Sequence, residues 1–106
     1  MRDARIVLVG GEAPADEIRL VLPMLVGRGR EAHLTLAHPL VSRKHCEIYE
    51  AHGQLRVRDL ESMIGTFIGN ERITDRVLRS GDLLTIGTAT FRCLYEPSLD
   101  IDRSMN

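Results

Sequence analysis

The stretch Gly27–His45, GRGREAHLTLAHPLVSRKH, decides how the rest of the chain is interpreted. It lies between two apolar runs with the character of strands, Pro23–Val26 and Cys46–Tyr49. A loop of this length is uncommon in a small domain and is usually functional or disordered. Its cations and its hydroxyl suit an oxygen-rich anion, because guanidinium groups offer forked donors and hydroxyl groups offer neutral ones. These residues are Arg28, Arg30, Arg43, Lys44 and Ser42. The alternative is a solvated loop whose charges serve only solubility.

Composition limits the classes of partner. The length of 106 residues suggests one domain, and the formal net charge of −1 argues against a general nucleic-acid binder, which needs a net basic face. No segment approaches the roughly 20 apolar residues of a membrane span, and Ile6–Val9 is too short for the core of a signal peptide. We therefore expect a cytoplasmic domain that binds neither nucleic acid nor membrane.

Apolar and polar residues alternate in short runs along the chain. Leu55–Asp59 is the clearest case, with Leu55 and Val57 on one face and Arg56 and Arg58 on the other. Turn signals separate these runs at the spacing typical of a β-sandwich. The pattern predicts an all-β fold, a two-sheet sandwich of about ten or eleven short strands. The expected strands are Arg5–Val9, Glu17–Leu22, Met24–Gly27, Leu34–Leu36, Lys44–Glu50, Leu55–Asp59, Thr66–Ile68, Glu71–Ile73, Arg76–Leu78, Leu83–Ile86 and Ala89–Tyr95.

The expected domain spans residues 1–96, and the polar residues 97–106 are expected to form a disordered tail. Within the domain, Ala15–Leu22 has an alternative as a short helix that begins at Asp16. Its apolar residues Ile18, Leu20 and Leu22 fit a period of two better than a helical period.

Three short motifs, each at the junction of a strand and a loop, follow one another along the chain. They are Gly27-Arg28, Ser42-x-x-His45 and Ser62-x-x-Gly65-Thr66. In this order and on an all-strand pattern, they resemble a forkhead-associated (FHA) domain over roughly residues 5–96. The resemblance implies an eleven-stranded sandwich that has no catalytic activity. It also implies that loops at one end of the sandwich bind phosphothreonine peptides.

Carried over by position, the resemblance implies that Arg28 and Ser42 hold the phosphate. Arg43 would make a further contact with phosphate or peptide, and Leu40 lies in the loop that commonly reads the third residue after the phosphothreonine. A dianion with three acceptor oxygens is well matched by an arginine fork and short neutral donors. The residues expected to support the site structurally, with His45 joining the loops by hydrogen bonds, are Gly27, His45, Gly65 and Thr66.

The sequence departs from the family pattern at two phosphopeptide-binding positions. Met63 and Ile64 stand where the family usually has Thr or Ser followed by Asn. The phosphate half of the site is therefore present, whereas the part that holds the peptide backbone is not. Either both side chains pack under the loop, or they form an exposed apolar patch that marks a partner surface.

We therefore expect a non-catalytic signalling module that recognises a threonine-phosphorylated protein or peptide. The alternative is a phospho-independent interaction domain, with self-association through Met63 and Ile64.

An enzyme or a metalloprotein is not expected. His45 and Cys46 are adjacent on a strand, so they point to opposite faces, and no histidine or cysteine has metal-ligand spacing in a partnered set. Asp59 and Glu61 lack an evident nucleophile nearby. Cys46 and Cys93 are expected to be buried reduced thiols rather than a disulfide framework. We expect no catalytic residue, metal or cofactor.

Overall fold

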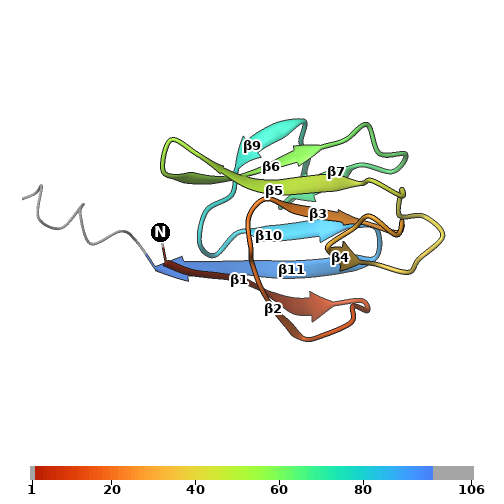
Figure 1. Cartoon of the computed structure of the whole chain (residues 1–106), viewed down its shortest axis with the longest axis horizontal. Coiled ribbons are helices and arrows are strands. Elements are labelled where there is room, and N and C mark those ends of the chain that lie inside the picture. The colour runs from red at the N-terminus through yellow and green to blue at the C-terminus, as the bar shows by residue number, and fades with distance from the viewer. Residues whose placement is uncertain (1, 97–106) are drawn as a thin grey trace, which may run out of the picture.

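A computed structural model describes residues 2–96, and within this range the chain forms eleven β-strands in two sheets and no helix (Figure 1). The strands are β1 (Arg2–Gly10), β2 (Glu17–Arg19), β3 (Met24–Gly27), β4 (Leu34–Thr35), β5 (Cys46–Ala51), β6 (Gln54–Asp59), β7 (Thr66–Ile68), β8 (Glu71–Arg72), β9 (Asp75–Val77), β10 (Leu83–Ile86) and β11 (Ala89–Glu96). The predicted all-β, two-sheet sandwich is confirmed. The predicted tail, residues 97–106, lies outside the described residues.

The two sheets differ in the number of strands and in strand order. The larger has the order β2-β1-β11-β10-β7-β8, and the smaller has the order β4-β3-β5-β6-β9. Neighbouring strands pair antiparallel except β3 and β4, which pair parallel. Because β3 and β4 run in the same direction, the chain leaves both of them at the same end of the sandwich (Figure 1).

The core lies between the sheets and follows the predicted alternation. Cys46 and Ile48 on β5 and Leu55 and Val57 on β6 are all buried, as are the inward side chains of β10 and β11. Cys46 and Cys93 are both free and buried, as expected. Burial raises the pKa of the Cys46 thiol and of the Cys93 thiol to about 12. Each large buried apolar side chain stabilises the fold by about 1.5–3 kcal/mol.

The structure differs from the predicted strands mainly at their ends. The strand expected over Glu17–Leu22 ends at Arg19, and the alternative helix in this segment is wrong. The strand expected from Lys44 begins at Cys46, so His45 lies before it. Strand alternation puts His45 on the face opposite Cys46, and both side chains are fully buried, because the loops cover His45. The alternation rule applies inside a strand, and His45 instead lies under the loops.

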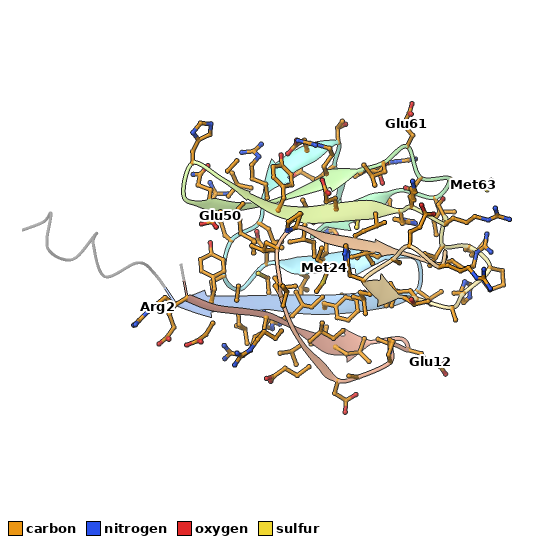
Figure 2. All side chains as sticks on the ribbon, in the orientation of Figure 1. Arg2, Glu12, Met24, Glu50, Glu61 and Met63 are labelled. Carbon is orange, nitrogen blue, oxygen red and sulfur yellow. The ribbon has the colours of Figure 1, made fainter. Side chains whose placement is uncertain are left out.

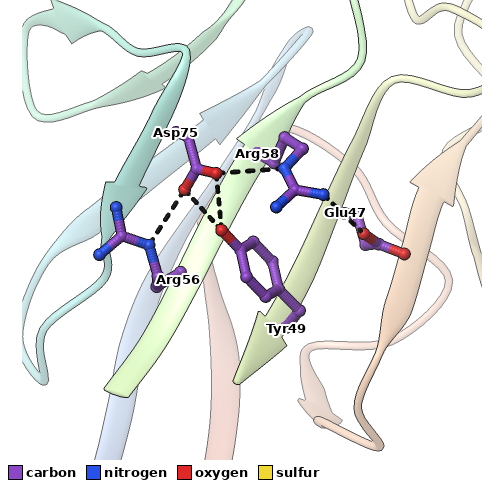
Figure 3. Close-up of polar contacts among 5 residues, drawn as sticks. All are labelled: Glu47, Tyr49, Arg56, Arg58 and Asp75. Atoms are coloured by element: carbon purple, nitrogen blue, oxygen red, sulfur yellow. Dashed lines mark hydrogen bonds and ion pairs between the residues drawn. The ribbon is translucent and has the colours of Figure 1, made fainter. Parts of the chain in front are cut away.

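The exposed face of the smaller sheet carries a polar group that we call the outer-face cluster (Figure 3). The Tyr49 hydroxyl on β5 lies 2.7 and 2.6 Å from the two carboxylate oxygens of Asp75 on β9. Arg56 and Arg58 on β6 each donate to Asp75 through Nε at 3.1 Å. The Arg58 guanidinium also lies 4.5 Å from the Tyr49 ring centroid and 3.9 Å from Glu47. Burial raises the pKa of Asp75, but these hydrogen bonds outweigh it and hold the pKa below its usual value. The cluster thus joins the edge strand β9 to β6 and β5.

Candidate functional site

Three loops meet at one end of the sandwich. They connect β3 to β4 (residues 28–33), β4 to β5 (residues 36–45) and β6 to β7 (residues 60–65). This end lies at the right in Figure 1, and the side chains of Glu61 and Met63 extend from it in Figure 2. All of the site residues predicted from the sequence lie in these loops or at the strand ends beside them.

The first two loops are joined through their backbones. The Arg28 amide donates to the Ser42 carbonyl at 2.9 Å, and the Gly29 amide donates to the Arg43 carbonyl at 3.0 Å. The approach is so close that a Cβ atom at Gly27 would overlap the Arg43 carbonyl oxygen. Only glycine fits at this position, so Gly27 allows the two loops to lie against each other.

Arg28 is exposed but oriented. Its Nε donates to the Val41 carbonyl at 3.0 Å, which fixes one edge of the guanidinium. Among residues 2–96, no acidic side chain forms an ion pair with Arg28, Arg30 or Arg43, all three of which are exposed. Lys44 differs, because its Nζ lies 3.4 Å from the Glu31 carboxylate. The terminal nitrogens of Arg28 are therefore held at the loop surface, where an anion from solution can reach them.

His45 joins the second loop to the third. Its Nδ1 accepts a hydrogen bond from the Ser42 amide at 3.1 Å, so the ring proton is on Nε2, which donates to the Gly65 carbonyl at 2.8 Å. The side chain is fully buried. His45 therefore faces inward, behind the loop surface, and has no access to a ligand.

The Ser42 hydroxyl makes a second bridge between these loops. Its Oγ accepts a hydrogen bond from the Met63 amide at 3.0 Å. Because the hydroxyl accepts here, its own hydrogen remains free to donate. Ser42 is half-buried, and this hydrogen is available to an acceptor at the loop surface beside Arg28.

The third loop is shaped by a carboxylate whose role the sequence reasoning missed. Asp59 Oδ1 accepts from the hydroxyls of Ser62 (2.6 Å) and Thr66 (2.7 Å), and Oδ2 accepts from the Ser62 amide (3.1 Å). The Ser62 hydroxyl in turn accepts from the Gly65 amide at 3.0 Å. Burial raises the pKa of Asp59, but the hydrogen bonds from Ser62 and Thr66 outweigh it and hold the pKa below its usual value. The spacing Asp59-x-x-Ser62, in which an Asp side chain can accept from the amide three residues on as it does in a capping contact, was the available signal.

The two residues that depart from the family pattern have different environments. Met63 is 81% exposed, the largest exposure of any large apolar side chain within residues 2–96. Ile64 is half-buried, and a Cβ atom built at Gly87 in the β10–β11 turn would lie 4.0 Å from its Cδ1. Met63 therefore projects from the loop, whereas Ile64 lies beside the neighbouring turn and is partly covered.

The described residues contain no set of three or more His, Cys, Asp or Glu side chains placed to hold a metal ion. They also form no helix of the length and apolarity that a membrane span requires.

Comparison with known proteins gives a consistent result. A family model described as the FHA domain matches residues 24–87, more than half of the chain. The ABC transporter ATP-binding/permease protein Rv1747 of Mycobacterium tuberculosis is 31% identical over 77 residues, which are 73% of this chain and 8% of that protein. The glycogen accumulation regulator GarA of Mycolicibacterium smegmatis is 32% identical over 74 residues, which are 70% of this chain and 47% of that protein. The chain thus spans less than half the length of these curated relatives.

Solved structures agree in fold. A chain from a study of phosphothreonine-dependent FHA domain interactions matches with a TM-score of 0.78 and 25% identity, over 90% of this chain and 98% of that chain. The FhaA FHA domain, solved in complex with the intracellular domain of Rv3910, matches with a TM-score of 0.74 and 25% identity, over 85% of this chain and 98% of that chain.

Proposed function

The chain belongs to the FHA-domain family, and from this premise we propose that its loop end binds a phosphorylated threonine in a partner protein. FHA domains bind phosphothreonine peptides and are generally non-catalytic. The observation that carries the proposal for this chain is that Arg28 and Ser42, whose backbones are hydrogen-bonded at 2.9 Å, both keep free side-chain donors. The Arg28 Nε donates to the Val41 carbonyl and its terminal nitrogens are free, and the Ser42 hydroxyl accepts from the Met63 amide and keeps its own hydrogen to donate.

The chemistry of these groups fits a phosphate. A phosphothreonine carries about two negative charges and three strong acceptor oxygens at neutral pH. Arg28 supplies a forked cation, Ser42 supplies a neutral donor, and Arg43 lies one residue further along the same loop. Hydrogen bonds to charged groups contribute about 1.5–3 kcal/mol each. Two or three of them, less the ordering of the peptide, support binding in the micromolar range.

The fixed geometry of the loops supports the same role. His45 and Ser42 each bridge the second and third loops, and Asp59 holds the third loop internally. A site that is already in its binding conformation loses little conformational entropy when the ligand arrives.

The proposed function extends to the boundaries of the domain, its cellular compartment and its partner. We assign residues 1–96 to the domain and place it in the cytoplasm as a non-catalytic signalling module. Two free buried thiols, Cys46 and Cys93, are in keeping with a reducing compartment. The partner is a threonine-phosphorylated protein, with no role for nucleic acid, membrane or cofactor.

A second candidate function is a phospho-independent interaction, including self-association, through Met63 and Ile64. The exposure of Met63 favours it, because a large apolar side chain in water is a common feature of partner surfaces. Because Ile64 is half-buried, less of its apolar surface is available to contact a partner protein.

A titration with peptide pools tests the proposal. A degenerate phosphothreonine pool and its unphosphorylated counterpart are titrated against the wild type, Arg28→Ala and the charge-matched control Arg19→Ala on β2. We expect phosphate-dependent binding that is lost in Arg28→Ala and kept in Arg19→Ala. Equal binding of both pools by the wild type would overturn the proposal and favour the phospho-independent function. Sedimentation at increasing protein concentration would then test whether the domain self-associates.

A further inference from the structure

Two exposed apolar side chains border the proposed phosphate site. Four large apolar side chains are exposed within residues 2–96, and Leu40 (49%) and Met63 (81%) are two of them. Leu40 precedes Ser42 by two residues, and the Met63 amide donates to the Ser42 hydroxyl oxygen. Figure 2 shows Met63 extending outward at the loop end. The Ser42 hydroxyl therefore lies between two loops that each present an apolar side chain.

The exposure of Leu40 follows from its backbone. Its amide donates to Nδ1 of His38 at 3.1 Å, and the Val41 amide donates to the His38 carbonyl at 2.9 Å. This turn buries the Val41 side chain and leaves Leu40 outside. Leu40 is thus held in solvent by hydrogen bonds that fix the turn.

The third loop has few polar side chains left for a ligand. The Ser62 hydroxyl is used by Asp59 and the Gly65 amide, and the Met63 amide is used by Ser42. Glu61 is exposed, and its negative charge would repel a phosphate. Among the exposed side chains of this loop, the one that can make a favourable contact beside the phosphate is therefore Met63.

We propose that Met63, assisted by Leu40, makes this site selective for a phosphothreonine that has an aliphatic or aromatic residue close by. The inference rests on the proposed function, because the phosphate on Arg28 and Ser42 brings the neighbouring residue onto Met63. A methionine side chain is flexible and polarisable, so it adapts to aliphatic groups and makes favourable contacts with aromatic rings. Covering a side chain as exposed as Met63 removes apolar surface from water and should raise affinity by about tenfold.

Matched phosphopeptides test this selectivity. Every peptide has a phosphothreonine at the same position. Each flanking position is occupied in turn by Leu, Phe or Ser, and an unphosphorylated copy of each peptide serves as a control. The proteins are the wild type, Met63→Ser, Leu40→Ser, Arg28→Ala and Val21→Ser. Val21 is the control because it is 71% exposed but lies between β2 and β3, at the other end of β3 from the site. Binding is measured by calorimetry or fluorescence anisotropy.

We expect the wild type and Val21→Ser to prefer Leu or Phe over Ser by about tenfold at one or more flanking positions. Met63→Ser should reduce this preference to about twofold or less while it still binds the Ser-flanked phosphopeptides, and Leu40→Ser should reduce it in part. An unchanged preference in Met63→Ser, or no preference in the wild type, would overturn the inference and leave the proposed function standing. Phosphate-independent binding, or full binding by Arg28→Ala, would overturn both.

Discussion

Replacing Asp59 by Asn tests whether one carboxylate holds the third loop in its binding conformation. Asp59 accepts hydrogen bonds from the Ser62 hydroxyl, the Ser62 amide and the Thr66 hydroxyl at 2.6, 3.1 and 2.7 Å. Asparagine has the same shape but no charge, and only one of its two terminal atoms accepts hydrogen bonds. Its amide group would therefore face at least one donor of Ser62 or Thr66.

The size of the effect follows from these contacts. A hydrogen bond to a charged group contributes about 1.5–3 kcal/mol, whereas a neutral one contributes about 1 kcal/mol. Asparagine keeps one or two neutral bonds in place of three charged ones, so the free energy of unfolding should fall by about 3 kcal/mol. With a urea dependence of about 2 kcal/mol per molar, the unfolding midpoint falls by about 1.5 M.

The effect should depend on pH in a defined direction. The pKa of Asp59 is lower in the folded state than in the unfolded state, because hydrogen bonds from Ser62 and Thr66 outweigh the effect of burial. Its contribution to stability is therefore complete above the unfolded pKa of about 4 and is lost as pH falls through the lower folded value. Asparagine does not titrate, so the difference between wild type and Asp59→Asn should be constant from pH 7 to about 5 and should narrow below about 4.

Urea unfolding followed by far-ultraviolet circular dichroism at pH 7, 5 and 3 measures this difference. Glu61→Gln is the matched control, because Glu61 lies in the same loop, is exposed and forms no ion pair within residues 2–96. The control should change stability by less than about 0.5 kcal/mol. The reasoning would be refuted if Asp59→Asn lowered the free energy of unfolding at pH 7 by less than about 0.5 kcal/mol. It would also be refuted if the difference in stability between wild type and Asp59→Asn stayed constant down to pH 3.

Three further predictions concern other parts of the fold. Gly27→Ala should lower the free energy of unfolding by more than about 2 kcal/mol in urea, whereas Gly10→Ala, whose Cβ would meet its nearest neighbour at 3.9 Å, should lower it by less than about 1 kcal/mol. Similar losses in both would contradict the close approach of the first two loops. Because their pKa is about 12, Cys46 and Cys93 should react with iodoacetamide at pH 8 at least about a thousandfold more slowly in the folded protein than in urea, and labelling at the rate of a free thiol would argue against their burial. Tyr49→Phe should destabilise the outer-face cluster by about 1 kcal/mol or less and leave phosphopeptide affinity unchanged, and a shift in affinity would connect that sheet face to the loops.

Much of the fold could be predicted from the sequence because strand alternation is local. Leu55 and Val57 reveal their inward face by spacing alone, and the structure buries both. The same rule did not reveal that His45 is buried, because the loops that cover a residue just before a strand are not part of the strand pattern. The order of the motifs, rather than any single residue, indicated the family that the comparisons show.

Apart from the local spacing Asp59-x-x-Ser62, the arrangement of the loops depends on contacts between residues that are further apart along the chain. Asp59 meets Thr66 across the third loop, so its role depends on a backbone conformation that the sequence does not display. Met63 and Ile64 are equivalent apolar neighbours in the sequence. In the structure their exposure differs, and Ile64 lies beside the turn at Gly87, which is distant along the chain. Distinguishing the exposed residue from the packed one therefore required the structure.

The pairing of β1 with β11 determines how the domain can be connected to other polypeptides. Arg2 lies opposite Glu96 in this ladder. Figure 2 shows Arg2 at the end of the sandwich remote from Met63 and the three loops. Linkers joined at these two residues would start side by side and on the far side from the ligand. The module could therefore be inserted into a longer chain as a branch or fused to a reporter at either side, with the loop end unobstructed in each arrangement.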